Sequence, residues 1–165
     1  MDIARQRDLQ RIEAQEKALQ FKAFDKAAAW ELGLRLKTLC EAAGVSTTIE
    51  IRLARETVFF YAMPGTTSSN TDWARRKRNV VELMGQSSYR VGLSFADGNS
   101  LEASMGLPPR DYACHGGSFP LQVECVGFIG VVTVSGLPQR QDHALVVQAL
   151  AEMCGVELAD VALTQ

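Results

Sequence analysis

The segment Cys114-His115-Gly116-Gly117 is the leading candidate site in this sequence. A neutral imidazole can coordinate a metal or exchange a proton near neutral pH. Two adjacent glycines permit unusual backbone angles and a close approach of the chain to a ligand. We therefore expect a ligand-binding loop here. The simpler alternative is that the glycines only shape the entry to a strand, while His115 hydrogen-bonds the backbone.

Asp142-His143 is the second candidate site. A carboxylate in the first turn of a helix can cap that helix, which is the simpler use of Asp142, or it can orient a basic group. If the last helix begins beside the glycine loop, His143 and His115 could form a ligand or proton-transfer pair. The chain has 2 histidines, so a three-histidine zinc site is excluded. The metal-ligand candidates are His115, His143 and Cys114, and Cys114 or Asp142 would have to complete any metal shell.

The run Arg75-Arg76-Lys77-Arg78 is the densest positive cluster. It lies in a helix predicted over 73–81, whose buried side holds Trp73, Val80 and Val81. The four cations could bind carboxylates or phosphate groups, although a solvated helix face is the simpler interpretation. Ser135 lacks the preceding glycine of a G-x-S-x-G nucleophile elbow, and no phosphate-binding Walker pattern occurs, so no hydrolase or nucleotide-enzyme motif is present.

A helix and a strand pair precede the basic cluster. Asp25 can cap a helix that Gly44 can end, because the apolar residues between them recur three or four positions apart. Polar and apolar residues alternate over 48–53, and residues 58–63 are more continuously apolar. The two segments predict an antiparallel hairpin with Arg55-Glu56 between them.

A second strand pair and a helix follow the glycine loop. Residues 119–126 and 128–134 predict a hairpin that turns at Val126-Gly127. Apolar residues then recur with helical spacing over 145–153, and Gly155 could end this last helix. The stretch 85–109 gives turn signals, among them Asp97-Gly98-Asn99, but no clear element.

Length and composition predict one domain over residues 1–165, with residues 1–22 as an N-terminal helical extension. The chain is 47% hydrophobic and has a net charge of −2, so nothing favours a nucleic-acid partner. We find no secretory signal and no run of about eighteen apolar residues, and therefore expect a cytoplasmic protein with no membrane partner. The four cysteines form no CxxC pair, which favours free thiols.

Three motifs together resemble the HbpS-like, or haem-degrading-domain, family. They are His115-Gly116-Gly117-Ser118-Phe119-Pro120-Leu121, the strand-rich run 126–137, and Gln141-Asp142-His143 at the start of the last helix. The resemblance spans about residues 25–153 and is strongest to an uncharacterised subfamily with HGGxFP and SGLPQxxDH signatures. It implies an α/β (α+β) protein with a profilin-like three-layer sandwich, in which helices flank an antiparallel sheet of about five strands. It also implies a homo-oligomer and haem or a related tetrapyrrole as a ligand.

The resemblance favours a small-ligand-binding homo-oligomer. Its predicted ligand-binding residues are Cys114, His115, Gly116, Gly117, Phe119, Arg76 and Lys77. The charges of the basic cluster could hold haem propionates, and Lys77 falls at the basic position of the corresponding family helix. The first alternative is an enzyme that acts on a small metabolite by acid–base chemistry of His115, Asp142 and His143. The second is a non-catalytic interaction or assembly protein. Family membership by itself does not establish turnover.

Overall fold

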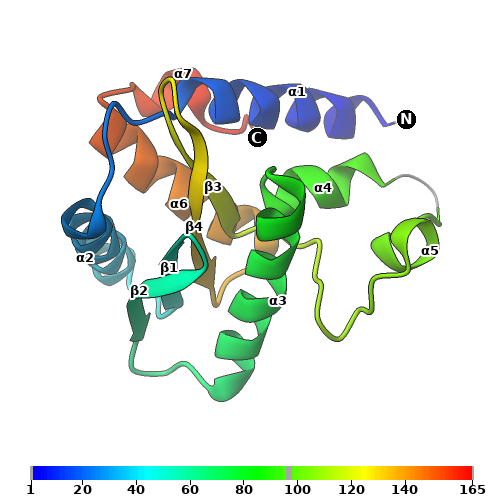
Figure 1. Ribbon diagram of the computed structural model, residues 1–165, viewed down its shortest axis with the longest axis horizontal. Coiled ribbons are helices and arrows are strands. Elements are labelled where there is room, and N and C mark those ends of the chain that lie inside the picture. Colours follow the sequence, from blue (N-terminus) through cyan, green and yellow to red (C-terminus); the bar gives the residue numbers. More distant parts are fainter. Residues whose placement is uncertain (1, 96–97, 165) are drawn as a thin grey trace.

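The computed structural model describes residues 2–95 and 98–164. Its centre is a sheet with the strand order β2-β1-β4-β3, in which every neighbouring pair is antiparallel (Figure 1). Both hairpins predicted from the sequence are present in this sheet. The strands are β1 (Thr48–Leu53), β2 (Glu56–Ala62), β3 (Ser118–Val123) and β4 (Gly127–Ser135).

Helices cover both faces of the sheet, so the protein has three layers (Figure 1). Helices α2 (Lys26–Ala42) and α6 (Gln139–Cys154) pack on one face, and α3 (Ser68–Met84) packs on the other. Alternation along β1 decides which side chains meet which layer. Ile49 and Ile51 join the main core with residues of α2 and α6, whereas Glu50 pairs with Arg78 of α3. The predicted α/β three-layer architecture is confirmed.

The remaining helices are short or lie at the periphery of the molecule. They are α1 (Ile3–Ala18), α4 (Ser88–Ser94), α5 (Leu101–Met105) and α7 (Leu158–Val161). Helices α4 and α5 occupy part of the stretch 85–109, which gave no clear element in the sequence. The turn predicted at Asp97-Gly98-Asn99 includes Asp97, which is outside the described residues.

Caps set the ends of the long helices. The Asp25 carboxylate accepts a hydrogen bond from the Ala28 backbone N–H at 2.8 Å, which starts α2 as predicted. Gly155 ends α6 in the left-handed conformation, with φ of 66°, also as predicted. Helix α3 begins earlier than the predicted residue 73, because the Asn70 side chain accepts from the Thr67 N–H at 2.9 Å and closes the first turn at Ser68.

Both hairpin turns differ from the predicted ones by one or two residues. Ala54 and Arg55 have φ of 47° and 67°, as a two-residue hairpin turn requires, and Glu56 therefore belongs to β2. In the second hairpin, β3 ends at Val123, and the chain turns through Cys125, whose φ is 63°. The pattern of apolar residues carries no signal for these positive φ angles, and the predicted turns were therefore misplaced.

The sheet has four strands among the described residues, where the family resemblance implied about five. Next to β3, at the edge of the sheet, Phe21 forms an isolated parallel bridge with Val123. Pairing cannot extend far beyond Phe21, because Asp25 four residues later already caps α2. The described residues therefore contain four strands and this one bridge, and the expected number of about five strands is slightly too high.

The predicted N-terminal helix, α1, lies across α4 and α7 (Figure 1). Its buried residues are one apolar side chain, Ile12, and three polar ones, Asp8, Gln15 and Glu16. Asp8 pairs with Arg140, Glu16 pairs with Arg90 at 2.5 Å, and the Gln15 amide donates to the Val161 carbonyl at 2.8 Å. Ion pairs and hydrogen bonds thus join Ile12 in holding this helix to the domain. No helix in the described part of the chain is long and apolar enough to cross a membrane.

Candidate functional site

A cleft of about 220 Å³ opens where α3, the glycine loop and the start of α6 meet. Three segments that are far apart in the sequence form its walls. The lining residues are Asn70, Trp73, Lys77, His115, Gly116, Ser135, Gly136, Leu137, Gln139 and Asp142. Four of the residues singled out from the sequence, Lys77, His115, Gly116 and Asp142, are therefore brought together.

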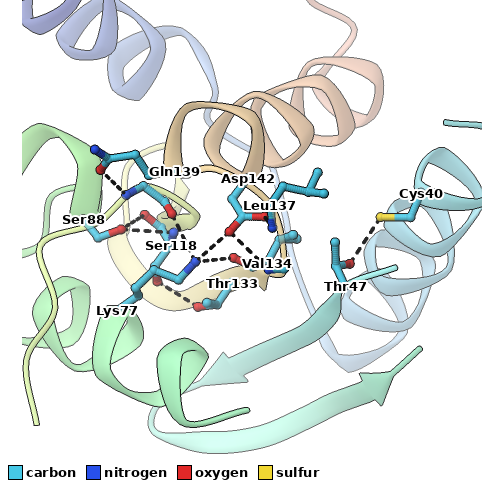
Figure 2. Close-up of polar contacts among 12 residues, drawn as sticks. Cys40, Thr47, Lys77, Ser88, Ser118, Thr133, Val134, Leu137, Gln139 and Asp142 are labelled. Atoms are coloured by element: carbon cyan, nitrogen blue, oxygen red, sulfur yellow. Dashed lines mark hydrogen bonds and ion pairs between the residues drawn. The ribbon is translucent and has the colours of Figure 1, made fainter. Parts of the chain in front are cut away.

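A buried ion pair forms the floor of this cleft. Lys77 Nζ lies 3.0 Å from Asp142 Oδ2 and donates to the Val134 carbonyl oxygen at 2.7 Å (Figure 2). It also donates to the Gly116 carbonyl oxygen at 3.1 Å. These three acceptors use all three protons of the ammonium group. The Asp142 carboxylate also accepts from the backbone N–H groups of Gly136 and Leu137.

Burial and pairing act in opposite directions on this pair. Burial lowers the pKa of Lys77, and attraction to Asp142 raises it. Burial likewise raises the pKa of Asp142, while Lys77 and the two backbone N–H groups lower it. Because each charge meets a full set of hydrogen-bond partners, we assign the ionised form to both groups. The ammonium group of Lys77 is therefore fully used in contacts within the protein, and it is not available to bind an anion as a member of the basic cluster.

The two glycines allow the loop to lie directly against the ion pair. Gly117 has φ of 129°, and a Cβ there would be 2.3 Å from the Val134 oxygen and 2.5 Å from Lys77 Nζ. A Cβ on Gly116 would be 2.3 Å from the Gln139 oxygen. No side chain tolerates contacts this short. The close approach predicted for these glycines is thus an approach to the protein's own backbone and to Lys77.

His115 is exposed at the edge of the cleft. Its ring meets the edge of the Trp73 ring, with centroids 5.1 Å apart and planes at 73°. Partial burial is the main cause that lowers the pKa of His115, and the positive charges of Lys77 and Arg76 lower it further. The imidazole is therefore neutral at pH 7, which is the form that coordinates a metal.

The other members of the basic cluster have separate partners. Arg75 pairs with Asp111 at 2.9 Å and Arg78 pairs with Glu50 at 2.9 Å. The Arg76 guanidinium lies 4.4 Å from the centre of the Trp73 ring, a cation–π distance. The cluster is therefore neither one anion-binding patch nor a simple solvated face. Arg76 is its member nearest the cleft, through Trp73.

Three predicted site residues lie away from the cleft. His143 is 1% exposed, and its Nε2 is 2.8 Å from Gln15 Oε1 beneath α1. Phe119 is a core residue of β3 whose ring lies near that of His143. Cys114 packs on the small apolar cluster beside α4, and burial raises the pKa of its thiol to about 11.

The structure therefore gives no support to a metal shell built from the predicted candidates. Within the described ranges, no three His, Cys, Asp or Glu side chains are grouped to hold a metal ion. His143 is bonded to Gln15, and Cys114 packs on the apolar cluster beside α4 and does not line the cleft. His115 is the remaining metal-ligand candidate that lines the cleft.

Sequence reasoning missed several residues of the cleft. Asn70 was assigned to neither a helix nor the site, and Trp73 was taken as part of a buried helix side. Ser135 and Gln139 belong to the SGLPQxxDH signature, but Ser135 was weighed only as a nucleophile and Gln139 was given no role. Besides that signature, a signal for both residues is the short connection from β4 to α6, which forces residues 135–139 to the edge of the sheet beside the glycine loop.

Comparisons with known proteins identify the family and the fold of the chain. Residues 24–151 match the family model described as "Haem degrading protein HbpS-like". A UPF0303 protein of Azotobacter vinelandii is 53% identical over 158 residues, which cover 95% of each chain. The solved structure of Ybr137w protein has a TM-score of 0.83 at 25% identity and covers 89% of this chain and 87% of its own. The crystal structure of a PduOC:heme complex has a TM-score of 0.67 at 19% identity, with 78% and 94% covered.

Proposed function

Because this chain belongs to the haem degrading protein HbpS-like family, we propose that it binds a small molecule at the cleft beside His115, with haem or a related tetrapyrrole as the ligand class. The observation that carries the proposal is the exposed, neutral imidazole of His115 at the edge of a cleft. One structural neighbour was solved as a haem complex, which supports haem as the first ligand to try.

The size of the cleft limits how a tetrapyrrole could bind. Pockets that enclose drug-sized ligands have volumes of roughly 300–1,000 Å³, and this cleft has about 220 Å³. A macrocycle therefore does not fit inside the cleft of one chain. The side chains at its edge do suit one: His115 supplies an imidazole for the iron, Trp73 supplies apolar ring surface, and Arg76 supplies a cation for a propionate.

The chain's own residues have distinct roles in this proposal. His115 would hold the iron, which supplies redox and ligand-binding chemistry when haem is bound. The Lys77–Asp142 pair would fix the loop that carries His115, because Lys77 binds the carbonyl oxygen of Gly116 next to it. Lys77 is thus a positioning residue, in contrast to the propionate contact expected for it from the sequence.

The geometry favours binding over the alternative of acid–base catalysis. That alternative needs His115, Asp142 and His143 to act together. Asp142 is engaged by Lys77 and two backbone N–H groups, and His143 is engaged by Gln15. We therefore assign no reaction to the cleft. The homo-oligomer and the interaction protein stay predictions, which light scattering of the purified chain would test.

A haem titration of the full chain tests the proposed function. We expect a saturable change of the Soret band, and His115→Ala should weaken binding about tenfold or more, since removal of even an outer-shell partner of a metal ligand costs about 10–100-fold. His143→Gln is the matched control, because it removes the other histidine, away from the cleft, and should bind haem normally. The absence of a saturable change, or equal binding by His115→Ala, would refute the proposal.

A further inference from the structure

We propose that one wall of the cleft is a carboxylate-binding subsite, formed by the side chains of Asn70, Ser135 and Gln139 beside the first turn of α6. The inference rests on the proposed function, in that the cleft binds a small molecule, and it specifies the chemical group that this molecule presents to the protein. Ser135 and Gln139 belong to the SGLPQxxDH signature, but none of the three residues is among the predicted ligand-binding residues.

The two amide side chains of the cleft have fixed orientations. Asn70 Oδ1 accepts from the Thr67 N–H at 2.9 Å, and Gln139 Oε1 accepts from the Gly116 N–H at 3.2 Å. A side-chain amide has one oxygen acceptor and one NH₂ donor group. Because the protein backbone uses both oxygens, the NH₂ groups are the ends left for a ligand. Both residues line the cleft.

Ser135 supplies a further polar group at this wall. The residue is 3% exposed and lines the cleft, and its hydroxyl forms no hydrogen bond with any residue the structure describes. The hydroxyl oxygen is not among the buried side-chain atoms that lack a partner, so it opens to the cleft, where it can bond to water or to a ligand. It can donate to an acceptor on that ligand.

The charges around the cleft favour an anion at this wall. Helix α6 has 16 residues and begins at Gln139, and the first N–H groups of such a helix lack partners within the helix and carry partial positive charge. On α3, Arg76 is positive, and on the loop His115 is neutral at pH 7. The negative charge of Asp142 is already balanced by Lys77 and two backbone N–H groups.

The same balance favours a carboxylate over a phosphate. Phosphate groups are typically bound by arginine or lysine side chains that are free to pair with them. Among the described residues that line the cleft, Lys77 is the one with a cationic side chain, and its ammonium group already donates to three protein acceptors. Neutral amide and hydroxyl donors beside a helix N-terminus suit the smaller charge of a carboxylate. The carboxylate could belong to a free small acid or to a tetrapyrrole propionate.

The test compares matched ligands on the full chain. Acetate and benzoate are titrated against acetamide and benzamide by calorimetry and by His115 NMR shifts, with inorganic phosphate as a further probe. Gln139→Glu keeps an oxygen for the Gly116 N–H but replaces the NH₂ donor with negative charge, and it should weaken carboxylate binding about tenfold or more. Gln148→Glu makes the same change on the same helix away from the cleft, and it should bind as the unmodified chain does.

The outcomes separate this inference from the proposed function. Equal binding of acids and amides, preference for phosphate, or unchanged affinity in Gln139→Glu would overturn the carboxylate subsite even if haem binds through His115. Conversely, carboxylate binding without a Soret change would sustain the subsite and refute the haem proposal. Haem and its dimethyl ester identify the source: weaker binding of the ester assigns the subsite to propionates, and equal binding assigns it to a separate acid. A failure of both haem and small acids to bind overturns both.

Discussion

Lys77 Nζ lies 3.0 Å from Asp142 Oδ2, and the two side chains are each 3% exposed. The pair joins the middle of α3 to the first turn of α6, across 65 positions of sequence. It lies under the glycine loop, because Lys77 also holds the Gly116 carbonyl. The cleft therefore depends on one charged contact between two distant helices.

We predict that removing one member of this pair costs much more stability than removing both. Lys77→Met leaves the Asp142 carboxylate buried and uncompensated, which should lower the free energy of unfolding by about 3–5 kcal/mol. The double variant Lys77→Met/Asp142→Asn should recover part of that loss. Urea denaturation measures both. Lys26→Met breaks the exposed pair with Glu56 and should change stability by less than about 1 kcal/mol. If the losses of unfolding free energy in Lys77→Met and in Asp142→Asn add up to the loss in the double variant, this account is contradicted.

Substitutions at two glycines with positive φ should distinguish the cost of backbone strain from the cost of a steric clash. Gly117 and Gly127 have φ of 129° and 105°, but only a Cβ on Gly117 meets other atoms, whereas nothing lies within 4 Å of one on Gly127. Gly127→Ala should therefore cost about 1–2 kcal/mol from strain alone. Gly117→Ala should cost clearly more and should disturb haem binding. Thermal unfolding followed by circular dichroism compares them, and equal melting temperatures would show that the loop can move away from Lys77.

We expect the buried His143 to make the protein less stable at acidic pH. Burial lowers its pKa from 6.5 to about 3. A histidine whose pKa is lower in the folded state adds its full stability above pH 6.5, and that stability is lost as the pH falls from about 6.5 toward 3. Its contribution should drop by about 2 kcal/mol between pH 7 and pH 5.

The His143→Gln variant isolates this effect. A glutamine NH₂ can still donate to Gln15 Oε1, the partner of His143, but it does not titrate. Urea denaturation at pH 7 and pH 5 should show a smaller loss for the variant than for the unmodified chain. If both lose the same stability, the acid sensitivity comes from other groups.

The four free cysteines should react with iodoacetamide in a clear order. Cys125 is exposed at a hairpin turn, so it should be alkylated first. Burial raises the pKa of both Cys114 and Cys154 to about 11, which leaves little reactive thiolate at pH 8, and Cys40 is buried. Mass spectrometry of timed samples gives the order, with denatured protein as the control. Early alkylation of Cys114 would restore it as a reactive group of the glycine loop.

Much of the fold could be predicted from the sequence because periodicity reports burial. The stripe between Asp25 and Gly44 and the alternation in β1 gave the correct elements. The turns at Arg55 and Cys125 were misplaced because positive φ at ordinary residues has no signal in polarity. The short helices α4 and α5 were missed because they bury few residues: α4 buries Ser88, Tyr89 and Val91, and α5 buries Leu101.

The candidate site was predicted less completely than the fold. The motif at His115-Gly116 located the cleft, but local patterns could not show that Lys77 is buried against Asp142. Sequence proximity was also misleading, because Asp142 faces the cleft while the adjacent His143 points to Gln15. Successive residues of a helix point about 100° apart, which places this pair of neighbours in two different environments.

The contacts of α1 with the rest of the domain determine how short a recombinant fragment can be. The family match begins at residue 24, yet Asp8, Gln15 and Glu16 of α1 are buried against partners that lie within the matched region. A fragment that begins at residue 24 would lack the carboxylates that pair with Arg140 and Arg90. It would also lack Gln15, so that His143 would be exposed to water. The recombinant unit for studies of the cleft therefore includes the first helix.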